Sequence, residues 1–340
     1  MKKDLKKYTI KDIASIAGVS PRTVSRVLNE EENVHPKTRN RVLEIIKNTG
    51  YEVNIIARSL RKKQTGIIIV FVGESTINYV GNFHNSVIRY IDVEANRLGY
   101  KVIISRSSAY KIEKDRHDGF YLLKNRLADG AVLFDTRDKD PRIEYLVTEN
   151  IPFVIIGKDP IYKNTSYVNL DNVKAGYIGA KYLIKKGYDS IVFFLGNKDF
   201  TVNHDRAEGF LSACIESNIG RFSIEYGVIN AKIAYKRTKE LLKQAKFPRA
   251  IFISGDERAT GVYHAIYEKS LKIPEDMAVL SIDNIPISEY FFPPLTTIDQ
   301  SVDKMAFHAI KILDNALKNP DHREFKRIIL PPKLIIRGSA

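Results

Sequence analysis

The chain has 340 residues, of which 44% are hydrophobic and 28% are charged. These proportions are typical of a globular protein and exclude a disordered or fibrous one, and the length predicts two or three domains. The net charge is +14, which favours a polyanionic partner.

The sequence shows no sign of membrane insertion, export or metal binding. No apolar run approaches the roughly 20 residues that span a bilayer, and the opening MKKDLKKYTI lacks the apolar stretch of a signal peptide. The single cysteine, Cys214, has no partner for an internal disulfide, and no cluster of Cys and His has zinc-ligand spacing. We therefore expect a cytoplasmic protein with no metal, no cofactor and no membrane contact.

Positive charge is concentrated in the first 65 residues, which hold 15 Lys or Arg against 7 Asp or Glu. A dense positive segment binds nucleic acid by releasing condensed counterions. Solvated protein faces also carry many lysines, so charge alone does not decide for DNA, and the evidence has to come from motifs.

Two short helices with a tight turn between them are predicted in this segment. Thr9 and Asp12 form a capping box that opens the helix TIKDIASIA, and Gly18 ends it. Ser20 and Pro21 suit the cap and the first position of a second helix, PRTVSRVLN. The pair forms a helix-turn-helix, in which the second helix lies in the DNA major groove.

The second helix has one polar face, and its residue types suit DNA. Guanidinium groups bind guanine bidentately, and hydroxyl groups bind phosphates. An ordinary amphipathic surface helix is the alternative. Val24, Val27 and Leu28 form the inward face. The polar residues are Arg22, Thr23, Ser25, Arg26 and Asn29.

The segments that follow carry a family resemblance. A third helix is predicted from Pro36 to about Asn48, and NIIARSLRKK comes after it. The succession of TIKDIASIAGVSPRTVSRVLN, HPKTRNRVLEIIKNTGY and NIIARSLRKKQTGIIIVFV resembles the headpiece of the LacI/GalR family of transcriptional regulators. The headpiece is then expected to span residues 1–50, with a hinge helix and linker over 51–65.

The resemblance implies a role for each matching residue. Arg22 and Arg26 would contact bases, with Pro21 at a neighbouring variable position, and a hinge helix over residues 54–62 would insert Leu60 into the minor groove. Where the family often has Tyr-x-Pro-Asn before the hinge, this chain has Val53 in place of the proline, and His35 replaces a Ser before Pro36. The full set of expected DNA contacts is Thr9, Ser20, Pro21, Arg22, Thr23, Ser25, Arg26, Asn29, Asn54, Ala57 and Leu60.

From Gly66 onward, apolar strand-like runs such as GIIIVFVG and SIVFFLG alternate with amphipathic helical stretches. Such runs are typical of parallel strands covered by helices on both faces, so the sequence predicts an α/β fold. No GxGxxG after a strand, no GxxxxGK[ST] and no G-x-S-x-G elbow is present. Nothing therefore indicates an enzyme.

The resemblance extends through this region in segments such as DRAEGF, PPLTTIDQ and the terminal LPPKLIIRGS. It implies a periplasmic-binding-protein-like domain over 66–340, built from two doubly wound parallel-sheet subdomains, which binds an effector and dimerises. We expect the N-terminal subdomain at about 66–167 and 298–325. The C-terminal subdomain is expected at about 168–297 and 326–340.

The family resemblance places Arg206 and Asp283 in the effector pocket. A guanidinium donates and a carboxylate accepts, so the two suit adjacent sugar hydroxyls, although an ion pair that only joins the subdomains is the alternative. Four further candidates are Phe83, Lys158, Phe200 and Asp256, of which either Phe could instead be core. After the predicted strand AIFIS, Gly255 replaces the Asn of lactose-repressor-like members, so the identity of their sugar does not apply to this chain.

These observations predict a homodimeric transcriptional regulator, usually a repressor, that binds a pseudopalindromic double-stranded operator. A small sugar is the expected effector, and a purine or a phosphorylated metabolite is the alternative. A solute-binding protein would carry an export signal and no headpiece, and a sugar-modifying enzyme would need a catalytic constellation. The sequence leaves open whether the effector releases or strengthens DNA binding and whether a phosphorylated carrier protein acts as corepressor.

Overall fold

The computed structural model describes residues 8–28, 31, 33–51, 64–73, 81–107, 112 and 118–340. The chain divides into two compact units, residues 1–65 and 66–340, which are described separately below. None of the helices in the described part is long and apolar enough to cross a membrane.

The first unit contains three helices, α1 (Ile10–Ala17), α2 (Pro21–Leu28) and α3 (Pro36–Thr49). The predicted capping box is present, since the Thr9 hydroxyl accepts from the Asp12 N–H and the Asp12 carboxylate accepts from the Thr9 N–H. Gly18 ends α1 in the left-handed region at φ 62°, which a residue with a Cβ adopts only at a cost. The helices pack around a small apolar core of Ile13, Ala14, Ala17, Val24, Val27, Val34 and Val42.

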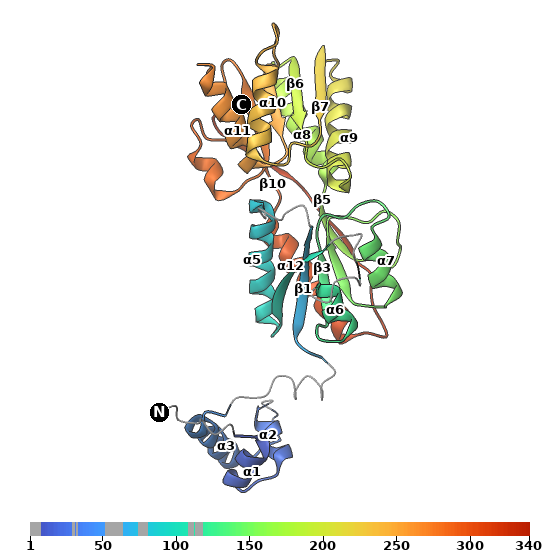
Figure 1. Cartoon of the computed structure of the whole chain (residues 1–340), viewed down its shortest axis with the longest axis vertical. Helices are drawn as coiled ribbons and strands as arrows, with labels where there is room; N and C mark the ends of the chain where they lie inside the picture. Colours follow the sequence, from blue (N-terminus) through green and yellow to red (C-terminus); the bar gives the residue numbers. More distant parts are fainter. Residues whose placement is uncertain are drawn as a thin grey trace. The chain divides into compact units, whose positions relative to one another are not determined.

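The second unit is built from two six-stranded sheets, each belonging to one lobe (Figure 1). The sheet of the first lobe has the order β11-β5-β4-β3-β1-β2 and is parallel throughout. The lobe's elements are β1 (Ile67–Gly73), α5 (Asn82–Arg97), β2 (Lys101–Ser107), α6 (Gly119–Lys124), β3 (Gly130–Leu133), α7 (Pro141–Thr148), β4 (Phe153–Ile156), β5 (Tyr167–Leu170), α12 (Val302–Lys318) and β11 (Arg327–Leu330).

The sheet of the second lobe has the order β12-β10-β9-β8-β6-β7, with only β12 antiparallel to its neighbour among the pairings of the described strands. The lobe's elements are α8 (Asn172–Lys185), β6 (Ser190–Phe194), α9 (Thr201–Glu216), β7 (Arg221–Glu225), α10 (Ala231–Leu241), β8 (Ala250–Ile253), α11 (Asp256–Glu268), β9 (Ala278–Asp283), the 3₁₀ helix η2 (Pro286–Tyr290), β10 (Thr296–Asp299) and β12 (Lys333–Ile335).

Alternate residues of the central strands face opposite helical layers, as the near-continuous apolar runs predict. In β6, Ile191 and Phe193 pack in the same cluster as residues of α8 and α9. Val192 and Phe194 pack in a second cluster with residues of α10 and α11. Both faces of the sheet are therefore buried, and the α/β fold predicted from the sequence is confirmed.

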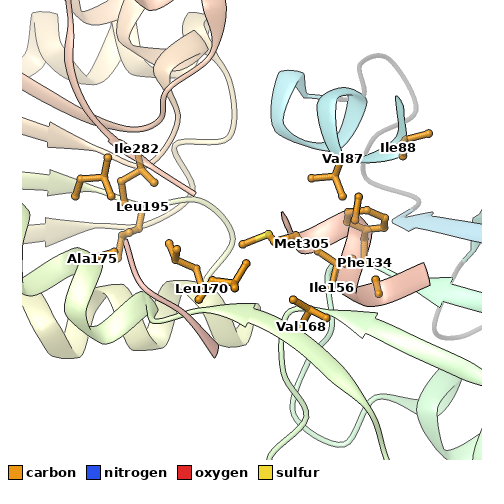
Figure 2. Close-up of a cluster of buried hydrophobic side chains, with 14 of the residues drawn as sticks. Val87, Ile88, Phe134, Ile156, Val168, Leu170, Ala175, Leu195, Ile282 and Met305 are labelled. Atoms are coloured by element: carbon orange, nitrogen blue, oxygen red, sulfur yellow. The ribbon is translucent and has the colours of Figure 1, made fainter. Parts of the chain in front are cut away.

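The chain passes three times between the lobes, after β5, after β10 and after β11. The sheets correct the predicted subdomain boundaries, because β5 ends at Leu170 and β11 at Leu330, both in the first lobe, while β10 lies wholly in the second. The predicted limits at 167 and 298 lie within β5 and β10, and the limit at 326 lies directly before β11. An apolar run in the sequence does not reveal which sheet it joins. Figure 2 shows Leu170 and Met305 between the apolar groups of the two lobes.

Candidate functional site

The polar face of α2 is the candidate DNA-reading surface. Val24 and Val27 are buried in the headpiece core, while Ser20, Pro21 and Arg22 are exposed. The periodicity of the helix therefore turns its polar residues outward, as the sequence predicts. Thr23, Ser25 and Arg26 are partly exposed on the same helix.

The N-terminus of α2 is fixed by side-chain hydrogen bonds. The Ser20 hydroxyl accepts from the Thr23 N–H at 3.1 Å, and the Ser20 and Thr23 hydroxyls are 3.0 Å apart. Arg26 Nε lies 3.7 Å from a carboxylate oxygen of Glu31, and both side chains are more than a third exposed. Such an exposed pair contributes little to stability, so Glu31 holds the Arg26 side chain only weakly.

The other predicted DNA contacts have two different outcomes. Thr9 is exposed, but its hydroxyl donates to Asp12 Oδ2 at 2.7 Å and caps α1. The remaining four positions, Asn29, Asn54, Ala57 and Leu60, lie outside the described residues, as does the predicted hinge helix over 54–62.

A cavity of about 760 Å³ lies between the two lobes of the second unit. Its wall includes Phe83 from α5, Phe200 at the cap of α9, Arg206 from α9 and Asp283 at the end of β9. The structure thus brings together four of the six residues predicted for the effector pocket. They meet because parallel strands present their carboxyl ends, and the helices that follow them, at one edge of each sheet.

Arg206 is almost fully buried and donates hydrogen bonds in three directions. Its Nε donates to Asn172 Oδ1 at 2.8 Å, its Nη1 to Ser254 Oγ at 2.6 Å and its Nη2 to Gln300 Oε1 at 3.2 Å. These acceptors are all neutral. Burial lowers the pKa of Arg206 to about 10, although the nearby Asp283 raises it, so the guanidinium stays charged at neutral pH.

Asp283 is joined to Arg206 through Gln300. The Gln300 Nε2 donates to Asp283 Oδ1 at 2.6 Å while its Oε1 accepts from Arg206. Burial, together with the charge of Asp256, raises the pKa of Asp283 to about 7 against the attraction of Arg206 and Arg258. The carboxyl group is therefore only partly ionised near neutral pH, and Gln300 bridges Asp283 and Arg206 at the cavity wall.

The two predicted aromatic residues line the cavity from opposite lobes. Phe83 belongs to the first turns of α5 and also packs against the main apolar core. The Arg137 guanidinium lies 5.6 Å from the centre of the Phe200 ring, and the two residues form an isolated β-bridge. This contact between the lobes fixes the Phe200 ring at the cavity wall.

Two predicted pocket residues, Lys158 and Asp256, are absent from the described residues that line the cavity. Lys158 Nζ instead donates to Asp205 Oδ1 at 2.6 Å, which joins the first lobe to α9 of the second.

Asp256 is fully buried and holds the second lobe together. Its carboxylate accepts from the Ile285 N–H at 3.0 Å and from the hydroxyls of Ser288 and Thr297 at 2.5 Å each. Asp256 opens α11 shortly after β8, at the edge of the sheet where its neighbours Gly255 and Glu257 line the cavity, but its own side chain bonds within the lobe.

Sequence reasoning missed three polar features of the same wall. His84 Nε2 lies 3.0 Å from Asp135 Oδ1, and although burial lowers the pKa of His84, Asp135 raises it above the ordinary value overall. Glu257 accepts from both the backbone and side-chain N–H groups of Asn82 at 3.2 Å. The third feature is Arg258. Asp135 follows β3, and Glu257 and Arg258 follow β8 in the first turn of α11, so their positions at the carboxyl ends of parallel strands could have indicated them. His84, on α5, had no such signal.

The described residues offer no site for a metal, since they contain no group of three or more His, Cys, Asp or Glu placed to hold an ion. The cavity wall instead combines aromatic rings with hydrogen-bond donors and acceptors. Such a lining binds a small polar organic molecule through a few placed contacts.

Comparisons with known proteins agree with this division of the chain. Residues 9–54 match the family described as "Bacterial regulatory proteins, lacI family", and residues 180–340 match "Periplasmic binding protein-like domain". The HTH-type transcriptional repressor PurR of Histophilus somni (strain 129Pt) is 33% identical over 334 residues, which cover 97% of this chain and 98% of the relative.

Two solved structures are similar over most of the chain. The Lac repressor dimer bound to operator and the anti-inducer ONPF has a TM-score of 0.84 at 23% identity, covering 98% of this chain and 99% of that one, and shows the shared fold. A LacI family transcriptional regulator from Enterococcus faecium with bound ribose has a TM-score of 0.69 at 25% identity, covering 80% and 98%. With the match to PurR over nearly its whole length, the chain belongs to the lacI family of bacterial transcriptional regulators, which bind DNA.

Proposed function

We propose that the chain is a repressor that binds a pseudopalindromic operator as a homodimer, and that a small sugar-like effector in the cavity controls its affinity for DNA. One observation carries this proposal: a single chain combines the outward polar face of α2 with a cavity between two lobes that is lined by aromatic and polar side chains. The solved Lac repressor is a dimer on its operator, which supports the same assembly here.

On the DNA side, Arg22 and Arg26 are the proposed base-reading residues. Each can bind guanine O6 and N7 with its planar fork, and the hydroxyls of Ser20, Thr23 and Ser25 are proposed to bind phosphates. Two headpieces, one from each copy, would meet two half-sites about one helical turn apart. We propose that Asn29, Asn54, Ala57 and Leu60 add contacts on the same DNA.

On the effector side, the cavity has the volume of a small-molecule pocket, and its aromatic and hydrogen-bonding lining suits a sugar. Arg206 and Asp283 would bind neighbouring hydroxyls, and Phe83 or Phe200 would cover the apolar face of the ring. The relative with bound ribose supports a sugar. A purine or a phosphorylated metabolite would use the same cavity and is the second candidate.

Coupling between the two sites is proposed to pass through the arrangement of the lobes. The cavity is bridged by Lys158 with Asp205 on one pair of elements and by Asn82 with Glu257 on another. A ligand shifts this arrangement only if it binds one state more tightly than the other. The sign of the effect, release or strengthening of DNA binding, is decided by which state the ligand favours.

The experiment measures binding of the purified chain to its own upstream region and to a shuffled duplex of equal length, by fluorescence anisotropy at two salt concentrations. We expect the native duplex to bind at least about 10³-fold more tightly, and a sugar that raises the melting temperature to change that affinity. Equal, purely salt-controlled affinity for both duplexes, unaffected by any sugar, purine or phosphorylated metabolite that binds, would contradict the proposal.

A further inference from the structure

A second arginine, Arg258, lies beside Arg206 on the wall of the cavity. Arg258 Nη1 donates to the backbone oxygen of Ser254 at 2.6 Å, and Arg206 Nη1 donates to the hydroxyl of the same Ser254 at 2.6 Å. One serine therefore brings the two guanidinium groups together. Arg258 follows Asp256 and Glu257 in the first turn of α11.

Two glycines leave the space in which the Arg258 side chain lies. A Cβ on Gly255 would come within 3.1 Å of Arg258 Nε, and a Cβ on Gly196 would come within 3.2 Å of Arg258 Nη1. Gly255 also has φ 130°, which disfavours other residues. The local backbone is thus compatible with an arginine lying flat along the wall.

The carboxylates near the two arginines form their hydrogen bonds with other groups. Asp135 is hydrogen-bonded to His84, Glu257 accepts from Asn82, and Asp205 accepts from Lys158. Asp283 faces both arginines, but it is bonded to Gln300 and its pKa of about 7 leaves it only partly ionised at neutral pH. The hydrogen bonds that Arg206 and Arg258 make to described residues end on neutral oxygen and amide groups.

Asp283, Glu257 and Asp135 attract Arg258, and Asp283 and Asp205 attract Arg206, but none of these carboxylates forms an ion pair or a hydrogen bond with either guanidinium among the described residues. A buried guanidinium group beside a half-buried one is stabilised further by an anion that bonds directly to both. A planar guanidinium fork matches the two oxygens of a carboxylate or a phosphate. A neutral sugar can satisfy donors of one arginine, but it supplies no negative group that pairs directly with both guanidinium groups.

We propose that the effector carries an anionic group, a carboxylate or a phosphate, which Arg258 binds together with Arg206. Arg258 is then a specificity-determining residue that separates sugar acids and sugar phosphates from neutral sugars. This inference rests on the proposed function and narrows its effector class.

The test compares matched ligands on the full chain by titration calorimetry and thermal unfolding. The probes are glucose, glucuronate and glucose 6-phosphate, the corresponding galactose series, ribose with ribose 5-phosphate, and inorganic phosphate against chloride at equal ionic strength. We expect a charged member to bind more tightly than its neutral counterpart. The uronate and phosphate arms identify which anion the site takes.

The variant Arg258→Gln is expected to weaken binding of that anion by roughly 10-fold to 100-fold. Arg258→Lys keeps the charge without the planar fork, so its affinity for the anion should lie between those of the wild type and Arg258→Gln. Arg237→Gln removes the same charge from α10, outside the cavity lining, and should bind the anion as the wild type does. Circular dichroism checks that each variant is folded. If Arg258→Gln does not fold, the comparison of Arg258→Lys with the wild type provides the test.

The inference is overturned if no anion stabilises the folded wild type beyond its neutral counterpart, or if Arg258→Gln and Arg258→Lys both bind the anion unchanged. A neutral sugar that alters operator binding would overturn it and leave the proposed function intact. Anion binding that depends on Arg258, in a chain with no preference for its own upstream region, would support the anionic effector site and contradict the proposed function.

Discussion

The proposed recognition helix α2 and the cavity between the lobes are built in opposite ways. Six of the predicted DNA contacts lie within seven consecutive positions from Ser20 to Arg26. The cavity wall is contributed by segments spread from Gly81 to Met305. In one helix a period of 3.6 residues decides which side chains are exposed, whereas an assembled wall depends on sheet register and on how two lobes meet.

The largest expected effect comes from removing the arginines of α2 and measuring both DNA binding and effector binding. We expect Arg22→Ala combined with Arg26→Ala to lower operator affinity roughly 30-fold to 20,000-fold, since each arginine on guanine contributes about 1–3 kcal/mol. Both are at least partly exposed, so the melting temperature and effector binding should be unchanged. Anisotropy with native and shuffled duplexes measures the loss, and retained preference for the native duplex would show that α2 is not the reading helix.

The same contrast explains how much the sequence predicts. The capping box at Thr9, the turn at Gly18 and the buried Val24 and Val27 all follow from local spacing, and the structure has each of them. In the second unit, spacing predicts the strands and the helices, but not which residues of a strand end face the cavity.

The cavity shows where prediction stops. Asp256 and Arg258 are neighbours in the first turn of α11, yet Asp256 is bonded to η2 and β10 and Arg258 lines the cavity. Because the two residues are two positions apart on a helix, their side chains point in directions about 200° apart. The sequence alone does not indicate which of these two directions faces the cavity. His84 and Asp135 meet only because α5 and the end of β3 adjoin, which no local pattern states.

Asp256→Ala distinguishes a structural carboxylate from an effector contact. The substitution leaves the Ile285 N–H and the Ser288 and Thr297 hydroxyls without their buried acceptor, and we expect a loss of roughly 3 kcal/mol in the free energy of unfolding. Urea unfolding measures it, with the exposed Asp199→Ala as control. Full stability with weakened effector binding would instead return Asp256 to the effector site.

Asp283→Asn gives the cavity a pH signature. Because burial raises the pKa of Asp283 to about 7, the folded chain holds this proton between about pH 4 and 7, where the unfolded chain has lost it, and stability falls as pH rises through that window. The introduced amide would keep an acceptor for Gln300 and has no charge to desolvate. We expect the variant to be more stable than the wild type by roughly 1–3 kcal/mol at pH 8, and by little at about pH 4.5. A difference in unfolding free energy that does not vary with pH would contradict this.

The smallest expected effect concerns Lys158, which the sequence assigns to the pocket and the structure pairs with Asp205 at 2.6 Å. If Lys158 acts by joining the lobes, Lys158→Met and Asp205→Asn should change effector affinity in the same direction, each by about 3-fold, and the double variant should add little to either. The coupling energy of such a partly buried pair is about 0.5–2 kcal/mol. If Lys158 contacts the effector, Lys158→Met alone should weaken binding and the two changes should add independently. A double-mutant cycle by calorimetry separates the cases, because only residues that act through one another show non-additive free energies.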